Sequence, residues 1–254
     1  MQASHELVSW VISSLLLSLR IAPVFALAPP FSLTTVPVAV RVLFGVGVAA
    51  CLISAHPADG LISDFGLGNL MVCGLRELLL GTVFLMAFQL TFGALYMAGR
   101  TIDIQAGFGL ATLIDPATAA QTPLIGTVYA FTAAAGFFSL GGQYELLHIA
   151  SGSLDAIPIG AARLPGNLEH LTGFIGLVMS LSLGVAGGAI LALFLADLSI
   201  AMLARTMPQM NVLILGFQVK TLLLLLVLPL TFGAFSALTL RLMSAMLQAL
   251  PSLT

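Results

Sequence analysis

The stretch Leu171–Ala196, LTGFIGLVMSLSLGVAGGAILALFLA, contains no charged residue in 26 positions. An α-helix rises about 1.5 Å per residue, so about 20 apolar residues cross the roughly 30 Å hydrocarbon core of a bilayer. The stretch therefore predicts a membrane-type helix.

Five other stretches have the same apolar character, and together the six predict an all-α, integral-membrane-type protein of helical hairpins. The segments are Leu7–Leu27, Val38–Ser54, Leu78–Ala98, Pro123–Leu140, Leu171–Ala196 and Val212–Leu240. The longest polar connection is expected at Gly141–His170. The first segment resembles the apolar part of a signal peptide, but no Lys or Arg precedes it, so we expect it to be retained.

The composition supports a membrane protein and excludes several function classes. The 254 residues carry eight basic and ten acidic side chains, 59% of residues are apolar, and the mean hydropathy is +1.13. A soluble domain is about one-quarter charged, and a nucleic-acid binder needs a basic patch that this chain lacks. The four His residues are isolated from one another and from Cys51 and Cys73, and no nucleotide-binding loop is present. We therefore expect no metal, no cofactor and no enzymatic activity.

The basic residues are spread almost evenly, at about one per segment or connection. Cytoplasmic loops of membrane proteins usually carry an excess of Lys and Arg. Only the connection His56–Asn69, with two Asp and no basic residue, is expected on the non-cytoplasmic side. The even spread suits a chain that matures inside a larger assembly.

The most unusual segment, Gly99–Pro123, predicts a break in the helix. Arg100, Asp103 and Gln105 are followed by Gly107 and Gly109 on either side of Phe108. Glycine weakens a helix, and non-helical backbone at membrane depth is tolerated where it is buried in protein or lines a cavity. Gly107–Ile114 is therefore a candidate pore-lining or gating loop, and an ordinary connection between two helices is the alternative. Its expected supports and caps are Asp103, Gln105, Asp115 as N-cap and Pro116 in the first turn.

Several charges fall inside the apolar segments or directly before them. Arg76 and Glu77 are adjacent, so on a helix each must find a partner elsewhere. Arg20, Arg41 and Lys220 are explained by snorkelling towards the interface, with a functional role as the alternative.

Two further features concern helix packing and turns. The pairs Gly184/Gly188 and Ala94/Ala98 are spaced for close helix contact. The run Met207, Pro208, Gln209, Met210 and Asn211 is expected to form a capped turn between two helices. The alternative is a partner-facing surface, because thioether side chains adapt to irregular surfaces.

The order of these motifs resembles a known family. The stretch AGRTIDIQAGFGLA at Ala98–Ala111, followed by Asp115–Pro116 and by QTP at 121–123, is similar to the central signature of the FliR family. A second similarity is MPQMNV at Met207–Val212, continuing to GFQVK at Gly216–Lys220. The family consists of flagellar type III export-gate proteins and related injectisome components.

This resemblance implies a non-enzymatic subunit of the export gate in the bacterial inner membrane, within the flagellar basal body. FliP-like and FliQ-like subunits would be its partners, together with FlhB-like and FlhA-like components, membrane lipid and unfolded export substrates, and without nucleic acid. Residues 1–165 would form a FliP-like part and 166–254 a FliQ-like hairpin of a single export-gate domain, 1–254. The family's pore plug would fall on Gly107, Phe108, Gly109, Leu110, Ala111 and Thr112.

A secondary transporter or channel for a small solute is the alternative function. It would use the broken helix between Asp103 and Asp115, with Asp103 as a coupling carboxylate. Such folds usually carry a matching interrupted segment in each half of the chain, and none is evident in this sequence.

Overall fold

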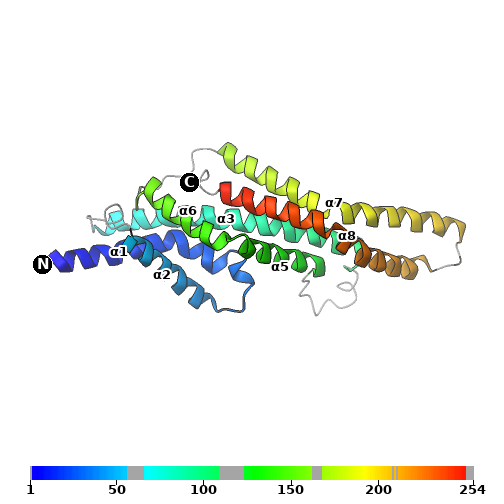
Figure 1. The fold of residues 1–254 in the computed structure, drawn as a ribbon, viewed down its shortest axis with the longest axis horizontal. Helices are drawn as coiled ribbons and strands as arrows, with labels where there is room; N and C mark the ends of the chain where they lie inside the picture. Colours follow the sequence, from blue (N-terminus) through cyan, green and yellow to red (C-terminus); the bar gives the residue numbers. More distant parts are fainter. Residues whose placement is uncertain are drawn as a thin grey trace. The chain divides into compact units, whose positions relative to one another are not determined.

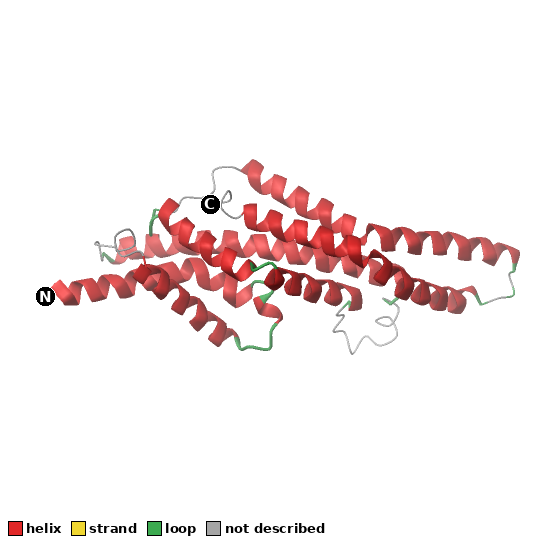
Figure 2. Ribbon diagram, viewed as in Figure 1, coloured by secondary structure: helices red, strands yellow, loops and turns green. Residues whose placement is uncertain are grey.

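The computed structural model describes residues 2–55, 66–108, 123–161, 168–207, 209 and 211–249. Within these residues the regular structure is helical and contains no strand, which confirms the all-α prediction (Figure 2). The elements, drawn in Figure 1, are α1 (Gln2–Leu27), the short 3-10 helix η1 (Phe31–Leu33), α2 (Val38–Ala55), α3 (Leu67–Ala106), α5 (Leu124–Ser139), α6 (Gly142–Ala156), α7 (Leu168–Thr206) and α8 (Val212–Ala249).

The six predicted apolar segments each lie almost wholly within one helix. Among the described residues, four helices, α1, α2, α3 and α7, are long and apolar enough to cross a membrane. The pair α5 and α6 would make a fifth, broken span. The membrane-type architecture is therefore confirmed, although α3 and α7 extend well beyond the apolar segments that predicted them.

Helix α6 corrects the prediction of a long polar connection at Gly141–His170. Its sequence, GQYELLHIASGSLDA, is too polar to stand out by hydropathy. Its apolar residues nevertheless recur at helical spacing, and the buried set is Leu146, Ile149, Ala150 and Leu154. The helix is amphipathic and packs against protein on one side, so it contains no continuous apolar run that would distinguish it from a polar connection.

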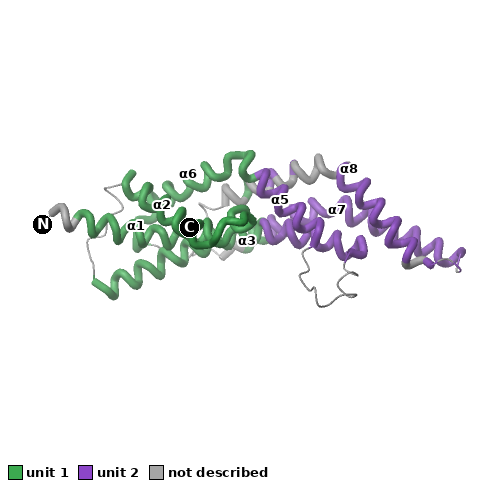
Figure 3. The backbone as a smooth tube through the Cα atoms, turned by 90° about the horizontal axis from the view of Figure 1, so that it is seen from below, with its two compact units in different colours: residues 1–91, 137–175, 244–254 green, residues 92–136, 176–243 purple. Residues whose placement is uncertain are grey.

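The chain divides into two compact units (Figure 3). The first unit consists of residues 1–91, 137–175 and 244–254, and the second of residues 92–136 and 176–243. The first unit therefore contains α1, α2, α6 and the beginning of α3. The second contains the end of α3 and most of α5, α7 and α8.

The first unit packs α2 against α1 and gathers aromatic rings around Phe25, Phe31 and Phe137. A Cβ added at Gly45 of α2 would lie 2.8 Å from Ala22 Cα of α1, so only glycine permits this approach. The ring centroids of Phe25 and Phe31 are 4.8 Å apart, and those of Phe31 and Phe137 are 6.2 Å apart. Such edge and tilted contacts are the favoured aromatic geometries.

In the second unit, the two predicted small-residue pairs behave differently. Ala94 and Ala98 of α3 are buried. Gly184 and Gly188 of α7 are exposed in the single chain. The spacing alone therefore did not distinguish a contact inside the chain from an outward-facing surface.

Candidate functional site

The break predicted after α3 occurs at Gly107, and it has the geometry of a helix C-cap. Gly107 has a φ of 93°, a backbone conformation that favours glycine. The Gly107 N–H donates to the Ile104 carbonyl (3.1 Å), and the Phe108 N–H donates to the Asp103 carbonyl (3.0 Å). This pair of bonds is a Schellman motif, which satisfies two of the carbonyls that a helix end leaves open.

The Asp103 side chain joins the end of α3 to the beginning of α5. Its carboxylate accepts hydrogen bonds from the backbone N–H groups of Ile125, at 3.0 and 3.1 Å, and of Gly126, at 3.3 Å. Pro123, just before α5, has no side-chain oxygen that could cap the helix. Asp103 is 4% exposed and supplies this cap from another helix, where a carboxylate also interacts favourably with the helix dipole. The two ends of the segment 107–123 are therefore fixed to each other.

Helices α3 and α5 cross at two glycines close to this cap. A Cβ added at Gly99 would lie 2.5 Å from both the Cα and the N atom of Gly126. A Cβ added at Gly126 would lie 2.8 Å from the Tyr96 carbonyl oxygen. Because backbone lies directly against backbone, the crossing requires glycine on both helices.

Helix α8 contacts the same end of α3 through Lys220 and Phe217. Lys220 Nζ donates a hydrogen bond to the Gln105 carbonyl oxygen (3.2 Å) and forms an ion pair with Asp197 of α7. The rings of Phe108 and Phe217 meet edge to face, with centroids 6.2 Å apart. Helix α8 thus contacts the last turn of α3 through Lys220 and the first side chain after Gly107 through Phe217, and Asp197 of α7 binds the same Lys220.

The structure places only part of the predicted site. Gly107, Phe108, Asp103 and Gln105 lie together at the end of α3, and Gln105 contributes its backbone carbonyl to the contact with Lys220. The predicted residues that fall outside the described part of the chain are Gly109, Leu110, Ala111, Thr112, Asp115 and Pro116.

The turn between α7 and α8 is capped by Asn211. Its side-chain oxygen accepts a hydrogen bond from the Ile214 N–H (3.4 Å), as an N-cap residue does. Met207 and Gln209 are exposed, whereas Pro208 and Met210 lie outside the described residues.

A second polar cluster lies in the first unit, around Arg20 of α1. Its guanidinium binds both carboxylate oxygens of Glu77, at 2.7 and 3.0 Å. It also donates to the carbonyl and the hydroxyl of Ser153, at 3.0 and 3.2 Å, and to the Ile157 carbonyl at 3.0 Å. Both charged side chains are 0% exposed. The snorkelling expectation is therefore wrong for Arg20, because a fully paired guanidinium does not need to reach water.

The adjacent residues Arg76 and Glu77 meet at one glycine. Glu77 Oε1 accepts a hydrogen bond from the Gly160 N–H (2.8 Å), and Arg76 donates to the Gly160 carbonyl (2.8 Å). Gly160 has a φ of 80° and is therefore also in the region that favours glycine. The two neighbouring charges thus bind the two sides of the same peptide turn after α6.

The sequence held a signal for the Arg20–Glu77 pair. Arg20 lies inside one apolar segment and Glu77 directly before another, and charges of opposite sign at such positions are expected to pair with each other. Ser153 and Gly160 carry no comparable signal. Within the described residues, no three His, Cys, Asp or Glu side chains gather as metal ligands would.

Comparison with known proteins identifies several relatives. The sequence model of a family described as "Bacterial export proteins, family 1" matches residues 11–246. The flagellar biosynthetic protein FliR of Bacillus subtilis is 29% identical over 211 residues, covering 81% of this chain and 80% of that protein. The FliR protein of Escherichia coli is 26% identical over 222 residues, covering 84% and 82%. The surface presentation of antigens protein SpaR of Shigella flexneri is 24% identical over 204 residues, covering 80% and 78%.

Proposed function

We propose that this chain, which belongs to the bacterial export proteins, family 1, forms part of the entrance pore of a type III protein export gate. We also propose that it supplies the plug of that pore. Membership in the family makes the chain a membrane-type component of the type III export apparatus. The pore, the plug and the residues assigned to them are our proposal.

One observation carries the proposal: α3 ends at Ala106, directly before Gly107, and the segment that follows has two fixed ends. The Schellman cap directs the chain out of the helix, and Asp103 ties the start of α5 to the end of α3. This tie keeps the ends of α3 and α5 together whatever conformation the segment between them adopts. A plug for unfolded chains needs this combination, because the pore must open while the surrounding assembly stays intact.

The apolar side chain of Phe108 suits such a plug. A conduit for many unfolded sequences should avoid fixed charges that bind one class of substrate, and Phe108 seals by apolar contact instead. Its ring lies against Phe217, so the closed position is supported by an aromatic contact. Energy for export would come from partners, and the subunit itself would be non-enzymatic.

We further propose that the chain assembles in the bacterial inner membrane with FliP-like and FliQ-like subunits, next to FlhB-like and FlhA-like components of a flagellar basal body. In this assembly residues 1–165 would act as the FliP-like part and 166–254 as the FliQ-like hairpin. The exposed apolar residues of α2 and α7, among them Phe44 and Leu183, support extensive contact with lipid or other apolar chains.

The substitution Gly107→Asp tests the role of the loop. An L side chain at a φ of 93° strains the cap, and the added carboxylate would have to be desolvated in the seal. We expect secretion to be lost while co-purification with the FliP-like and FliQ-like subunits is retained. Gly152→Asp, at an exposed glycine of α6 with open space around it, is the matched control. Normal secretion by the Gly107→Asp variant would contradict a plug.

The double substitution Phe108→Ala and Leu110→Ala tests the seal itself. Loss of two apolar side chains should raise ion conductance through the resting complex in planar bilayers. Phe138→Ala, at an exposed phenylalanine of α5, is the control. Unchanged conductance would remove these two residues from the plug.

The sequence left a small-solute transporter as the alternative function, and the contacts of Asp103 argue against it. Both oxygens of Asp103 accept hydrogen bonds from the α5 backbone, so capping accounts for this carboxylate without a coupled ion. Expression with and without the two partner subunits decides between the functions. A homogeneous, stable particle of this chain alone would favour the transporter.

A further inference from the structure

We propose that Lys220 positions the last turn of α3, and that Asp197 holds the Lys220 side chain in place. We call this contact of Lys220 with Gln105 and Asp197 the latch. The inference rests on the proposed plug function for its consequence, but the latch itself is a local contact that can be measured separately. Three helices contribute, namely α3 through Gln105, α7 through Asp197 and α8 through Lys220.

Lys220 binds one of the carbonyls that are left open at the end of α3. A helix end leaves its last four carbonyls without an intrahelical partner. The Asp103 carbonyl accepts from the Phe108 N–H, and the Ile104 carbonyl accepts from the Gly107 N–H. The next carbonyl in line is that of Gln105, and Lys220 binds it. Lys220 therefore extends the Schellman cap by one carbonyl, at a helix end where a cation is favoured.

A second residue of α8, Phe217, contacts the same end of α3 as Lys220. Phe217 precedes it by three residues, so the two side chains share one face of the helix. Phe217 meets Phe108, the residue immediately after the Gly107 break, and Lys220 meets Gln105 just before it. Helix α8 thus contacts both sides of the break.

The Lys220–Asp197 ion pair is partly exposed in the single chain. The Lys220 and Asp197 side chains are 19% and 43% exposed. Charges that keep access to a polar surrounding can separate at much lower cost than fully buried ones. In the single chain, separating this contact therefore costs less than separating the fully buried Arg20–Glu77 pair, as a latch requires.

The consequence is that the α7–α8 hairpin supports Gly107 and Phe108, the two residues that directly follow α3. Movement of α8 relative to α3 would withdraw both Lys220 and Phe217 from the break, and the first residues of the loop would lose their support. Partners that press on this hairpin would then open the gate without touching the loop.

Hydrogen–deuterium exchange on the assembled complex tests the latch directly. The variant Lys220→Met keeps an unbranched side chain of similar length but removes the cation. We expect exchange in the peptide that contains Gly107 and Phe108 to become at least threefold faster, because the cap frays. Lys220→Arg should restore exchange to within twofold of wild type. The peptide around Ser153 in the first unit should not change in either variant.

Asp197→Asn provides a second variant in case Lys220→Met fails to assemble, and it should speed exchange at the same peptide to a smaller degree. Unchanged exchange at Gly107 and Phe108 in both variants would overturn the latch. Resting ion conductance is measured on the same samples. Faster exchange together with higher conductance supports both the latch and the plug, whereas faster exchange with unchanged conductance leaves the latch standing and contradicts the plug.

Discussion

The two charge clusters of this chain use the same chemistry with very different burial. In the first unit, Arg20 makes five hydrogen bonds and forms a bidentate pair with Glu77, and both side chains are 0% exposed. In the second unit, Lys220 contacts Asp197 and one carbonyl, and both side chains keep some exposure. The planar guanidinium of arginine holds its hydrogen-bond partners in fixed directions, whereas the ammonium group of lysine acts as a point charge.

This difference assigns a different task to each cluster. Breaking a fully buried pair leaves an uncompensated charge and costs about 3–5 kcal/mol. Losing a partly exposed pair or a cation at a helix end costs about 0.3–1 kcal/mol. The Arg20 cluster therefore fixes α1, α3 and α6 to one another permanently, while the Lys220 cluster can be rearranged during function.

The largest expected effect comes from Glu77→Ala. Arg20 would lose its counter-charge and the Gly160 N–H would lose its acceptor, so we expect a loss of about 3–5 kcal/mol in stability. Thermal unfolding of the purified complex in detergent measures the loss, and the amount of protein in membranes provides a second readout.

The double variant Arg20→Met and Glu77→Met is the control for that prediction. Replacing both charges by apolar side chains of similar volume removes the buried charge altogether, so a large part of the stability should return. A Glu77→Ala variant that is no less stable than Lys220→Met would remove the contrast between the two clusters.

The second prediction concerns the base of the loop, where Gly99→Ala should separate α3 from α5. The new Cβ would meet backbone atoms of Gly126 at 2.5 Å, and backbone cannot move aside as a side chain can. We expect a loss of about 1–3 kcal/mol, typical of overpacking, together with faster hydrogen exchange at Ile125 and Gly126. Thermal unfolding and exchange on the same sample measure both.

Gly93→Ala in the same helix is the matched control. Its Cβ would meet nothing within 4 Å, and alanine is favoured over glycine inside a helix by about 1 kcal/mol. It should therefore be neutral or stabilising. Equal behaviour of the two variants would mean that the Gly99–Gly126 crossing is not close in the assembled protein.

Three of the eight basic residues lie where a helix ends. Arg41 donates to the Ala26 carbonyl at the end of α1, Lys220 to Gln105 at the end of α3, and Arg20 to Ser153 and Ile157 at the end of α6. Each cation thus serves the C-terminus of a different helix, where the dipole favours positive charge. Because these basic residues lie where helices end inside the protein, they need not follow the usual excess of positive charge on the cytoplasmic side of a membrane.

Hydropathy predicted the six apolar helices, and the glycines at 107 and 109 predicted the break, because both depend on local sequence. The partners of the charges depended on tertiary structure and could be predicted only in part. The adjacency of Arg76 and Glu77 required separate partners, but nothing local indicated that both would bind Gly160. Asp103 was identified as a support of the loop, yet its target, the start of α5, lies 22 residues further along the chain.

The third prediction places Lys220→Met on the same stability scale. Loss of the ion pair and of the carbonyl contact should lower stability by about 0.3–1 kcal/mol, several-fold less than Glu77→Ala. Thermal unfolding under identical detergent conditions makes the comparison. Raising the salt concentration should weaken the wild-type contact because the pair is partly exposed, and it should leave the Arg20 cluster unaffected. A salt-sensitive first unit would reverse the assignment of the two tasks.

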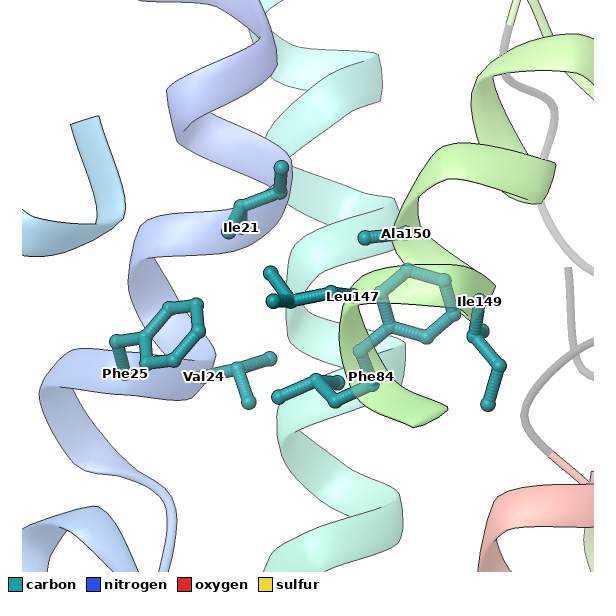
Figure 4. A pocket seen from close by; sticks show the side chains of 8 residues that line it. Ile21, Val24, Phe25, Phe84, Leu147, Ile149 and Ala150 are labelled. Carbon is teal, nitrogen blue, oxygen red and sulfur yellow. The ribbon is translucent and has the colours of Figure 1, made fainter. Parts of the chain in front are cut away.

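The smallest expected effect tests how completely the first unit is packed around its buried ion pair. The first unit contains an apolar cavity of about 10 Å³, and Figure 4 shows side chains that line it, among them Ile21, Val24, Phe84 and Ala150. Val24→Ile adds one methyl group and keeps the β-branched shape, so we expect a gain of up to about 1 kcal/mol. Val40→Ile, at a position that is 52% exposed on α2, is the control and should change stability little. A loss of stability in Val24→Ile would contradict this expectation. It would mean that the helices around Arg20 and Glu77 are held too rigidly to accept one more methyl group. The fixed geometry of the ion pair would then extend to the packing beside it.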